Sequence, residues 1–541
     1  MLILKGRGVA GGIVCGKIIF YDRSVPEVKK TLIVDREAER LRFECARKQA
    51  CDELDALNAH ALESIGEQEA EIFEIHRMML DDTDYVESIT DKISGEGFCA
   101  EYAVDETAQV FAETFSSMTD NEYMQARAAD VRDISGRIIG ILTGHRGTLE
   151  LHEPSIVVTD DLAPSETVSL ARSLLLAIVT SGGSTNSHTA ILSRTMGIPA
   201  IVTVDGVSAG LDGRIAIANA ATGELCVDPD EAALASYGRM RDELAHKAQM
   251  LKTLVGKPNE TLDGHSIKLF ANIGSPSDID AAIANDAGGI GLFRSEFLYL
   301  ESDGYPSEDT QLAAYREVLE RMGDREVVIR TLDIGADKKI GYFELPEEEN
   351  PALGFRAIRI CLERPEIFKT QLRALLRASV YGNLQVMFPM IASEWEIDRI
   401  KELVSEAKIE LDTRKESYSD SVKWGIMVET PAAAVISDLL AKKVDFFSIG
   451  TNDLTQYTLA ADRQNAGAEK FADPRHEAVL RLIELTVKNA HAAGIWVGIC
   501  GELAADPSLT EKFLRFGVDE LSMSPTRILE VRERVRSLDL N

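Results

Sequence analysis

Residues 422–453 read VKWGIMVETPAAAVISDLLAKKVDFFSIGTND. Two short apolar runs, 422–428 and 444–449, are rich in β-branched and aromatic residues and predict buried strands. A helical pattern follows the first run, so the stretch predicts a strand, a helix and a second strand. An acidic residue follows each strand, Glu429 after the first and Asp453 after the second. The stretch therefore predicts two carboxylates at the carboxyl ends of neighbouring strands.

The same alternation runs from His265 onward and predicts eight strands, each followed by at least one helix. The predicted strands are SIKLFANI (266–273), GIGLFRSE (289–296), EVVIRTLDI (326–334), LQVMFPMI (384–391), VKWGIMVET (422–430), VDFFSIGTND (444–453), IWVGICGE (495–502) and DELSMS (519–524). Eight such units within about 275 residues match a closed (β/α)8 barrel, in which the active site lies at the carboxyl ends of the strands. A doubly wound open sheet is the alternative fold, and the count of eight favours the barrel.

The composition predicts a soluble protein of two or three domains. The chain has 541 residues, 45% of them hydrophobic and 27% charged, and no apolar run approaches the length that spans a bilayer. The apolar stretch after Met1 is too short for a signal peptide, which predicts a cytoplasmic protein without membrane insertion. Seven cysteines are scattered without a C-x-x-C pair, so neither a disulfide framework nor a zinc site is expected. A formal net charge of -31 argues against a nucleic-acid partner and makes a small basic protein a plausible one.

The amino-terminal half divides into two further regions. Helical periodicity without strand patterning runs from about Glu37 to Gly144, and short Val- and Ile-rich strands follow it. Because the strand-like GKIIFYD precedes the helices, we expect the helical block to be inserted after the first strand of an α/β domain. The predicted fold class is multidomain α/β. Its parts are an α/β domain (1–28 and 145–227), an inserted helical bundle (29–144), a linker helix with a hinge (228–258) and the barrel (259–541).

Three arginines follow the ends of predicted barrel strands. Arg294 and Arg330 stand at strand ends, and Arg463 lies a little further along the chain. A guanidinium donates two parallel hydrogen bonds to a phosphate or a carboxylate, so three of them at one barrel mouth suit a ligand that carries both groups. Taken singly, an arginine at such a place more often forms a loop salt bridge.

Other strand ends carry groups suited to metal binding and proton transfer. Glu429 and Asp453 could bind Mg2+, which takes few protein carboxylates and leaves positions for substrate oxygens, and Asn452 lies beside Asp453. Cys500 follows the seventh strand. A lone cysteine in an apolar strand is most often a small buried hydrophobic residue, but a protonated thiol at this position could also deliver a proton to an enolate.

A second candidate site lies in the stretch LLLAIVTSGGSTNSHTAILSRTMGIPAIVTV (174–204). The pattern predicts a strand, a glycine turn and a short helix that begins at His188 and ends at Gly197. The start of a helix favours the neutral, nucleophilic imidazole and stabilises an anion attached to the ring, which suits a phosphohistidine. The alternative is a surface histidine beside a turn. No G-x-S-x-G elbow and no H-x-x-x-H pair is present to indicate a serine hydrolase or a paired zinc site.

Stretches along nearly the whole chain resemble one family, the phosphoenolpyruvate-protein phosphotransferases, enzyme I of the bacterial sugar phosphotransferase system. They include AADVRDI, GGSTNSHTAILSR, GIGLFRSEFL, VVIRTLDIGADK, ENPALGFRAIR, GIMVETPAA, FFSIGTNDLTQYTLAADR, GICGELAAD and DELSMSP. The histidine segment alone is less specific, because dikinases that make or use phosphoenolpyruvate share it. The ordered series of stretches is typical of the phosphotransferases.

The resemblance implies a function for each candidate. His188 would take the phosphoryl group of phosphoenolpyruvate on its Nε2 nitrogen, and Cys500 would protonate the departing enolate to give pyruvate. The implied substrate-binding residues are Arg294, Arg330, Asn452, Asp453 and Arg463, and the implied Mg2+ ligands are Glu429 and Asp453. The helical insertion would dock the phosphocarrier protein HPr, which takes the phosphoryl group from His188 for sugar uptake. The histidine domain would swivel between the barrel and the carrier, and the family forms homodimers through the barrel.

Other functions fit the sequence less well. A dikinase or a phosphoenolpyruvate synthase needs a large nucleotide-binding domain ahead of the histidine domain, and the nitrogen-branch paralogue of enzyme I needs an amino-terminal sensor domain. A metal-dependent lyase of pyruvate-like substrates would explain the barrel mouth but not His188 or the helical block. A non-catalytic protein that binds a carrier and reports a metabolite would show no phosphoryl transfer.

Overall fold

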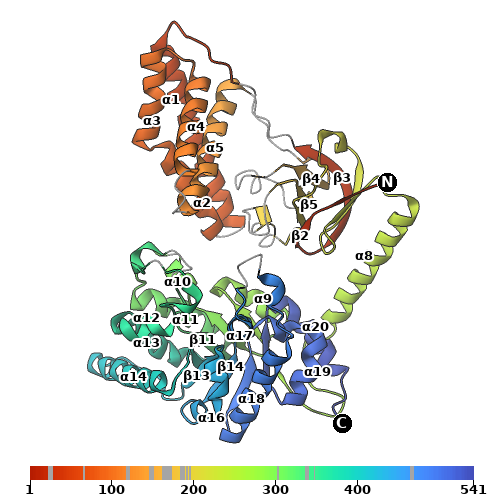
Figure 1. Cartoon of the computed structure of the whole chain (residues 1–541), viewed down its shortest axis with the longest axis vertical. Coiled ribbons are helices and arrows are strands. Elements are labelled where there is room, and N and C mark those ends of the chain that lie inside the picture. The colour runs from red at the N-terminus through yellow and green to blue at the C-terminus, as the bar shows by residue number, and fades with distance from the viewer. Residues whose placement is uncertain are drawn as a thin grey trace. The chain divides into compact units, whose positions relative to one another are not determined.

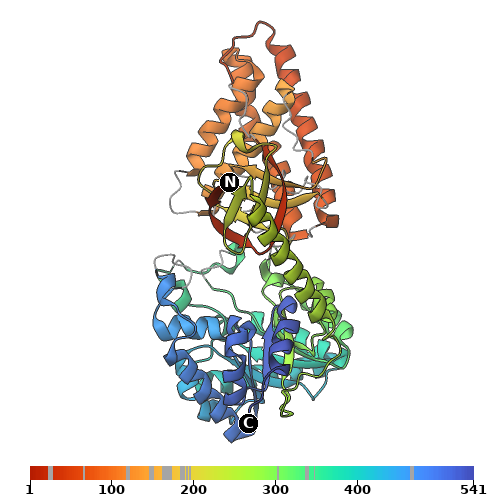
Figure 2. The same ribbon diagram turned by 90° about the vertical axis from the view of Figure 1, so that its right-hand side faces the viewer.

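The computed structural model describes residues 1–21, 28–64, 67–116, 122–144, 151–160, 162, 174–182, 189–190, 193, 197–300, 302, 304–335, 340–346, 348–462 and 468–541. Within these ranges the chain forms two compact units, Met1–Ala245 and His246–Asn541 (Figures 1 and 2). The first unit contains a mixed sheet and a set of helices, and the second contains a closed barrel. The predicted multidomain α/β fold is confirmed.

The sheet of the first unit has eight strands in the described part of the chain, in the order β1-β8-β7-β3-β4-β5-β6-β2. Strands β3 to β6 pair in parallel, and the remaining neighbours pair antiparallel. The strands are β1 (Leu2–Lys5), β2 (Arg7–Ala10), β3 (Ile13–Tyr21), β4 (Ser155–Thr159), β5 (Leu175–Thr180), β6 (Ala200–Val202), β7 (Ile215–Asn219) and β8 (Glu224–Val227). Buried Ile, Val and Ala side chains lie on both faces of the central parallel strands, which is typical of a sheet covered on both sides.

Five α-helices lie between β3 and β4 within the described ranges: α1 (Arg36–Ser64), α2 (Glu67–Leu80), α3 (Thr83–Asp91), α4 (Ala100–Ser116) and α5 (Glu122–Thr143). They share one hydrophobic core, to which Phe43, Leu54, Phe73 and Ile138 contribute. The helical insertion is confirmed, but its predicted place after the first strand was wrong, because β1, β2 and β3 all precede it.

Glycines hid the second strand, β2, from the sequence pattern. The segment GRGVAGG interrupts the alternation of apolar and polar residues that marks a strand. Gly8 is required by a close approach of two backbones, since a Cβ atom at this position would lie 1.7 Å from the carbonyl oxygen of Ala220. Helix α8 (Glu231–Lys252) follows the sheet, and none of its side chains is buried.

The second unit contains eight parallel strands that close into a barrel. They are β9 (Lys268–Ile273), β10 (Ile290–Arg294), β11 (Glu326–Arg330), β12 (Asn383–Phe388), β13 (Lys423–Val428), β14 (Phe446–Ile449), β15 (Trp496–Ile499) and β16 (Glu520–Met523). Each corresponds to one predicted strand. The last strand pairs with the first, Leu521 with Leu269, so the open-sheet alternative was wrong.

Helices surround the barrel strands in Figure 1. The described helices of this unit are α9 (Ile279–Ala284), α10 (Phe297–Leu300), α11 (Glu308–Met322), α12 (Ile358–Glu363), α13 (Pro365–Ala378), α14 (Glu394–Arg414), α15 (Pro431–Val435), α16 (Ser437–Leu440), α17 (Thr451–Leu459), α18 (Glu477–Ala493), α19 (Pro507–Phe516) and α20 (Ile528–Arg536). None of the helices described in either unit is both long and apolar enough to cross a membrane.

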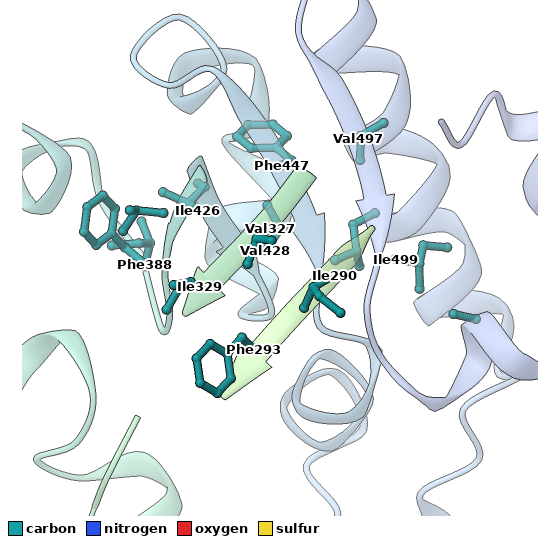
Figure 3. Close-up of a cluster of buried hydrophobic side chains, with 14 of the residues drawn as sticks. Ile290, Phe293, Val327, Ile329, Phe388, Ile426, Val428, Phe447, Val497 and Ile499 are labelled. Carbon is teal, nitrogen blue, oxygen red and sulfur yellow. The ribbon is translucent and has the colours of Figure 1, made fainter. Parts of the chain in front are cut away.

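The barrel strands present two different faces. Alternate residues such as Val327, Ile426 and Ile499 belong to the large core shared with the helices, and Figure 3 shows these side chains with others of the same core. The residues between them belong to a separate cluster inside the barrel, made of Leu292, Val328, Met387, Met427, Phe446 and Cys500. Membership of one cluster or the other therefore shows which side chains of each strand face the barrel interior.

Candidate active site

The rim at the carboxyl ends of the barrel strands gathers six of the predicted site residues. Arg294 and Arg330 are the last residues of β10 and β11, Glu429 and Cys500 directly follow β13 and β15, and Asn452 and Asp453 lie in the first turn of α17, after β14. Since all eight strands run parallel around one closed barrel, these ends lie at the same rim. The candidate site residues of the barrel are therefore brought together, as far as they are described.

Arg294 and Arg330 are direct neighbours, in register on adjacent strands. Arg294 is exposed, whereas Arg330 is 8% exposed. The Arg330 Nη2 atom donates to Glu296 Oε1 at 2.6 Å, and Nη1 lies 2.8 Å from Asp333 Oδ2. Burial lowers the pKa of Arg330, but the negative charges of Asp333, Glu296 and Glu429 outweigh it and raise the pKa overall. Arg330 is thus a fixed cation at the rim.

Two further charged residues belong to this network. Asp333 Oδ1 accepts a hydrogen bond of 2.9 Å from Arg356 Nη2, and both side chains are buried. Burial lowers the pKa of Arg356, but the charge and hydrogen bond of Asp333, together with the charges of Tyr457 and Asp453, outweigh burial and raise the pKa overall. Sequence analysis did not single out Glu296, Asp333 or Arg356. The first two follow strand ends, the same signal that identified Arg330, whereas Arg356 lies in the loop before α12 and carries no such signal.

Glu429 and Asp453 are the carboxylates of the rim. Glu429 is 1% exposed, and its Oε1 atom accepts a hydrogen bond of 2.6 Å from the Met390 backbone N–H. Burial and the neighbouring charges of Asp453 and Asp333 raise the pKa of Glu429 to about 8, against the lowering effect of Arg330. A divalent cation between the two carboxylates would relieve this repulsion.

The described residues fit Mg2+, which needs few protein ligands, better than they fit a metal ion that is bound by protein side chains alone. No group of three or more His, Cys, Asp or Glu side chains within the described ranges is placed to bind a metal ion. Mg2+ commonly uses one or two carboxylates and takes its other ligands from water and substrate phosphate. Glu429 and Asp453 match that requirement, as two buried carboxylates from adjacent strand ends.

Cys500 lies inside the barrel at the rim and is 4% exposed. Its Sγ atom is 3.7 Å from the carbonyl oxygen of Ile449. Burial, together with the charges of Glu520 and Glu429, raises the pKa of Cys500 to about 12, although Ser448 and Arg330 act in the opposite direction. The thiol is therefore protonated at neutral pH, as an acid must be, and is a poor nucleophile.

Asn452 links two adjacent strand ends. Its Nδ2 atom donates to Glu502 Oε1 at 3.2 Å, and its Oδ1 atom accepts from the Glu502 backbone N–H at 3.1 Å. The side chain is partly exposed at the rim. This reciprocal pair fixes the first turn of α17, which also carries Asp453, against the segment after β15.

Two predicted site residues, His188 and Arg463, lie outside the described residues. The segment before His188 is described as far as Gly182, whose backbone N–H donates to the Asp160 carbonyl oxygen at 2.8 Å after the end of β5. Thr189 is buried, and its hydroxyl donates to the carbonyl oxygen of Leu162 at 3.2 Å. The chain on both sides of His188 is thus anchored to the α/β domain.

Three family models match the chain. The model described as PEP-utilising enzyme, PEP-binding domain, matches residues 248–540, the N-terminal model of PEP-utilising enzymes matches residues 5–127, and their mobile-domain model matches residues 151–223. The first model covers the barrel that carries the rim residues.

Several curated relatives match along their length. Each is named phosphoenolpyruvate-protein phosphotransferase. The protein of Priestia megaterium is 43% identical over 538 residues, which are 99% of this chain and 94% of the relative. The protein of Bacillus subtilis (strain 168) is 44% identical over 543 residues, again 99% of this chain and 94% of the relative. The protein of Staphylococcus carnosus (strain TM300) is 41% identical over 543 residues, with the same coverage.

Proposed function

The chain belongs to the phosphoenolpyruvate-protein phosphotransferase family, and from this membership we propose which residues carry the reaction and where the phosphoryl group goes. The activity of the family is phosphoryl transfer from phosphoenolpyruvate in the sugar phosphotransferase system. In this chain the phosphoryl group passes to His188, pyruvate is released, and the group then passes to the phosphocarrier protein HPr to drive sugar uptake. The observation that carries the proposal is the barrel rim, where arginines, two carboxylates and a buried thiol meet.

Phosphoenolpyruvate carries phosphate and carboxylate groups, and the rim offers cations for both. Arg294 is exposed and free to reach into the mouth, while Arg330 beside it is held by Glu296 and Asp333 and supplies a fixed positive charge. With Asn452, Asp453 and Arg463 they form the proposed substrate-binding set. Because Arg330 and Asn452 are held by their neighbours before substrate arrives, they stabilise charge on the transferring group without reorganisation.

Glu429 and Asp453 would hold Mg2+ in this proposal. When bound, the ion neutralises charge on the transferring phosphoryl group. The chain's own contribution is to keep two carboxylates together in a buried place, with Glu429 fixed by the Met390 N–H at 2.6 Å.

Cys500 is the proposed acid. Transfer of the phosphoryl group leaves the enolate of pyruvate, and Cys500 donates its proton to the methylene carbon of that enolate. Two features support this role: the thiol lies at the rim on the inner face of the barrel, and its raised pKa keeps it protonated.

The amino-terminal regions serve the second transfer. We assign residues 1–28 and 145–227 to a swivelling phosphohistidine domain, 29–144 to HPr docking, 228–258 to the linker and hinge, and 259–541 to the phosphoenolpyruvate-binding barrel. The exposed helix α8 suits a linker, since none of its side chains is buried. The proposal also includes a cytoplasmic location and a homodimer formed through the barrel, as in the family.

The test is phosphorylation with radiolabelled phosphoenolpyruvate and Mg2+. The wild-type protein should gain one acid-labile phosphoryl group per chain and release one pyruvate, and His188→Ala should gain none. A suitable control is His246→Ala, because His246 is exposed on α8. Labelled wild type should then pass the group to added HPr. A His188→Ala protein that still accepts the label, or a wild type that accepts none, overturns the proposal.

A further inference from the structure

The interior of the barrel holds a buried carboxyl group, Glu520, that the rim does not use. The side chain of Glu520 is fully buried on β16. Leu521 and Met523 belong to the core between the barrel and its helices. Since side chains alternate between the two faces of a strand, Glu520 and Ser522 face the barrel interior. Barrel interiors are usually filled by bulky branched apolar side chains, and a carboxyl group there calls for a reason.

Two glycines make room for this carboxyl group. A Cβ atom on Gly498 would lie 1.9 Å from Glu520 Oε2, and a Cβ atom on Gly291 would lie 2.4 Å from Glu520 Oε1. Neither carboxyl oxygen has a hydrogen-bond partner of ordinary geometry within the described residues. The barrel is thus built around a buried carboxyl group for which the Ser522 hydroxyl is the one hydrogen-bonding side chain indicated among the described residues, and such burial is costly for a purely structural residue.

Glu520 lies one layer below Cys500 inside the barrel. It is in register with Gly498 on the neighbouring strand, two residues before Cys500 and on the same face. Ser522 stands at the level of Cys500, because Asn272 Nδ2 donates to the carbonyl oxygens of both, at 3.0 and 3.2 Å. The Ser522 hydroxyl is also close to Glu520, since both would lie within 2.6 Å of a Cβ atom on Gly291. Glu520, Ser522 and Cys500 therefore form a column that leads to the rim.

The opposite end of the column reaches solvent. Lys268 is the register partner of Glu520 on β9, and its Nζ atom lies 2.6 Å from Glu326 Oε2. The Lys268 and Glu326 side chains are 44% and 27% exposed, respectively. The end of the column away from the rim therefore carries a solvent-exposed charged pair.

We propose that Glu520 is the internal proton source that restores the Cys500 thiol after each turnover, through the hydroxyl of Ser522. This inference rests on the proposed acid role of Cys500. In the first step the Cys500 S–H bond breaks and a C–H bond forms on the enolate, which leaves a thiolate. The Ser522 hydroxyl then gives its proton to the sulfur and takes the proton of the Glu520 carboxyl group. The Glu520 carboxylate regains a proton from water at the Lys268–Glu326 end.

The protonation state of Glu520 supports this direction of transfer. Burial raises the pKa of Glu520 to about 8, so the group carries a proton at neutral pH. The Ser522 hydroxyl and the charge of Lys268 on β9 lower the pKa of Glu520, whereas Glu326 on β11 and Asp519 before β16 raise it. Its charge also acts on the Cys500 thiol, which directly follows β15. A carboxyl group is a stronger acid than a thiol, so a thiolate takes its proton readily.

The test separates the first turnover from later ones. Glu520→Gln keeps the size of the side chain but has no proton to give. With phosphoenolpyruvate and Mg2+ but no acceptor, this variant should release one pyruvate per site at the wild-type rate, since Cys500 starts protonated. With HPr in excess, its later turnovers should be slower by about tenfold or more. Ser522→Ala should behave in the same way, whereas Cys500→Ala should lose the first turnover as well.

A pH profile and a matched variant exclude a merely structural effect. The later turnovers of wild type should slow as the pH rises through about 8, where Glu520 loses its proton, and this limb should be missing in Glu520→Gln. Gln385→Leu is the control, because Gln385 is a buried polar side chain that alternation places on the inner face of β12, a strand that pairs with neither β15 nor β16. If turnovers after the first run at the wild-type rate in both Glu520→Gln and Ser522→Ala, the inference is overturned. If the wild-type protein makes no pyruvate, the proposed function is overturned instead.

Discussion

The charge of Asp333 should stabilise the barrel unit by several kcal/mol. Its two carboxylate oxygens lie 2.8 Å from Arg330 Nη1 and 2.9 Å from Arg356 Nη2, and all three side chains are less than 10% exposed. Asp333→Asn keeps the shape and removes the charge. Arg330 retains Glu296, but Arg356 pairs with no other carboxylate among the described residues. Because the variant removes the ion-pair partner of a buried guanidinium and leaves it only the charge of Asp453 nearby in the described part of the chain, we expect a loss of about 3–5 kcal/mol in the free energy of unfolding.

The assay is equilibrium unfolding of the full chain, followed with a probe in the barrel unit. Asp333→Asn should lower both the denaturant midpoint and the melting temperature, and it should weaken phosphoenolpyruvate binding because Arg330 loses one of its two anchors. Asp309→Asn is the matched control: Asp309 lies 2.8 Å from Arg377, but its side chain is 82% exposed. An exposed pair of this kind contributes at most about 1 kcal/mol. Equal losses in the two variants, or no loss in Asp333→Asn, would refute the reasoning.

Four further predictions concern other parts of the molecule. Cys500→Ala should slow pyruvate release by about 100-fold or more while leaving phosphoenolpyruvate affinity within about twofold, measured by rapid quench and calorimetry; an unchanged rate would make the thiol a packing residue. Glu429→Gln should raise the Mg2+ concentration needed for half-maximal pyruvate release at least about tenfold, and chelation of Mg2+ should stop the wild type; unchanged Mg2+ dependence would exclude Glu429 as a ligand. Gly8→Ala should destabilise the first unit, since the added Cβ would lie 1.7 Å from the Ala220 oxygen, and a melting temperature equal to wild type would contradict that contact. Folding raises the pKa of Glu520 from 4.5 to about 8. Between these two pH values the folded chain therefore binds more protons than the unfolded chain does. Wild-type stability should therefore fall as pH rises from about 5 to 8, and Glu520→Gln should melt increasingly above wild type across that window; parallel melting curves would count against a buried acid.

The barrel and its rim could be predicted from the sequence because both follow from local rules. The composition of a short apolar strand identifies it, and the first polar residue marks its end. The sequence therefore placed Arg330 at the end of β11 and Glu429 directly after β13. The second strand, β2, was missed because Gly8 makes a long-range approach to Ala220 that no local pattern encodes. Arg356 was missed for the same reason: its partner Asp333 is distant in sequence, and the loop that carries it has no periodicity.

The alternation of side chains along each strand also identifies which residues fill the barrel interior. Alternation along β15 places Gly498 and Cys500 inside and Val497 and Ile499 outside. Applied to DELSMS, the same alternation places Glu520 inside with Ser522, where a branched apolar residue is the ordinary choice. The inward-facing Glu520 could therefore be found in the sequence. Its neighbours could not, because they depend on closure of the barrel, in which β16 pairs with β15 on one side and with β9 on the other. The fold makes room for a buried carboxyl group that, among the described residues, has only the Ser522 hydroxyl beside it and lies one layer below a thiol at the rim. Proton supply explains this group better than stability does, since a glutamine of the same size would cost the fold less at neutral pH.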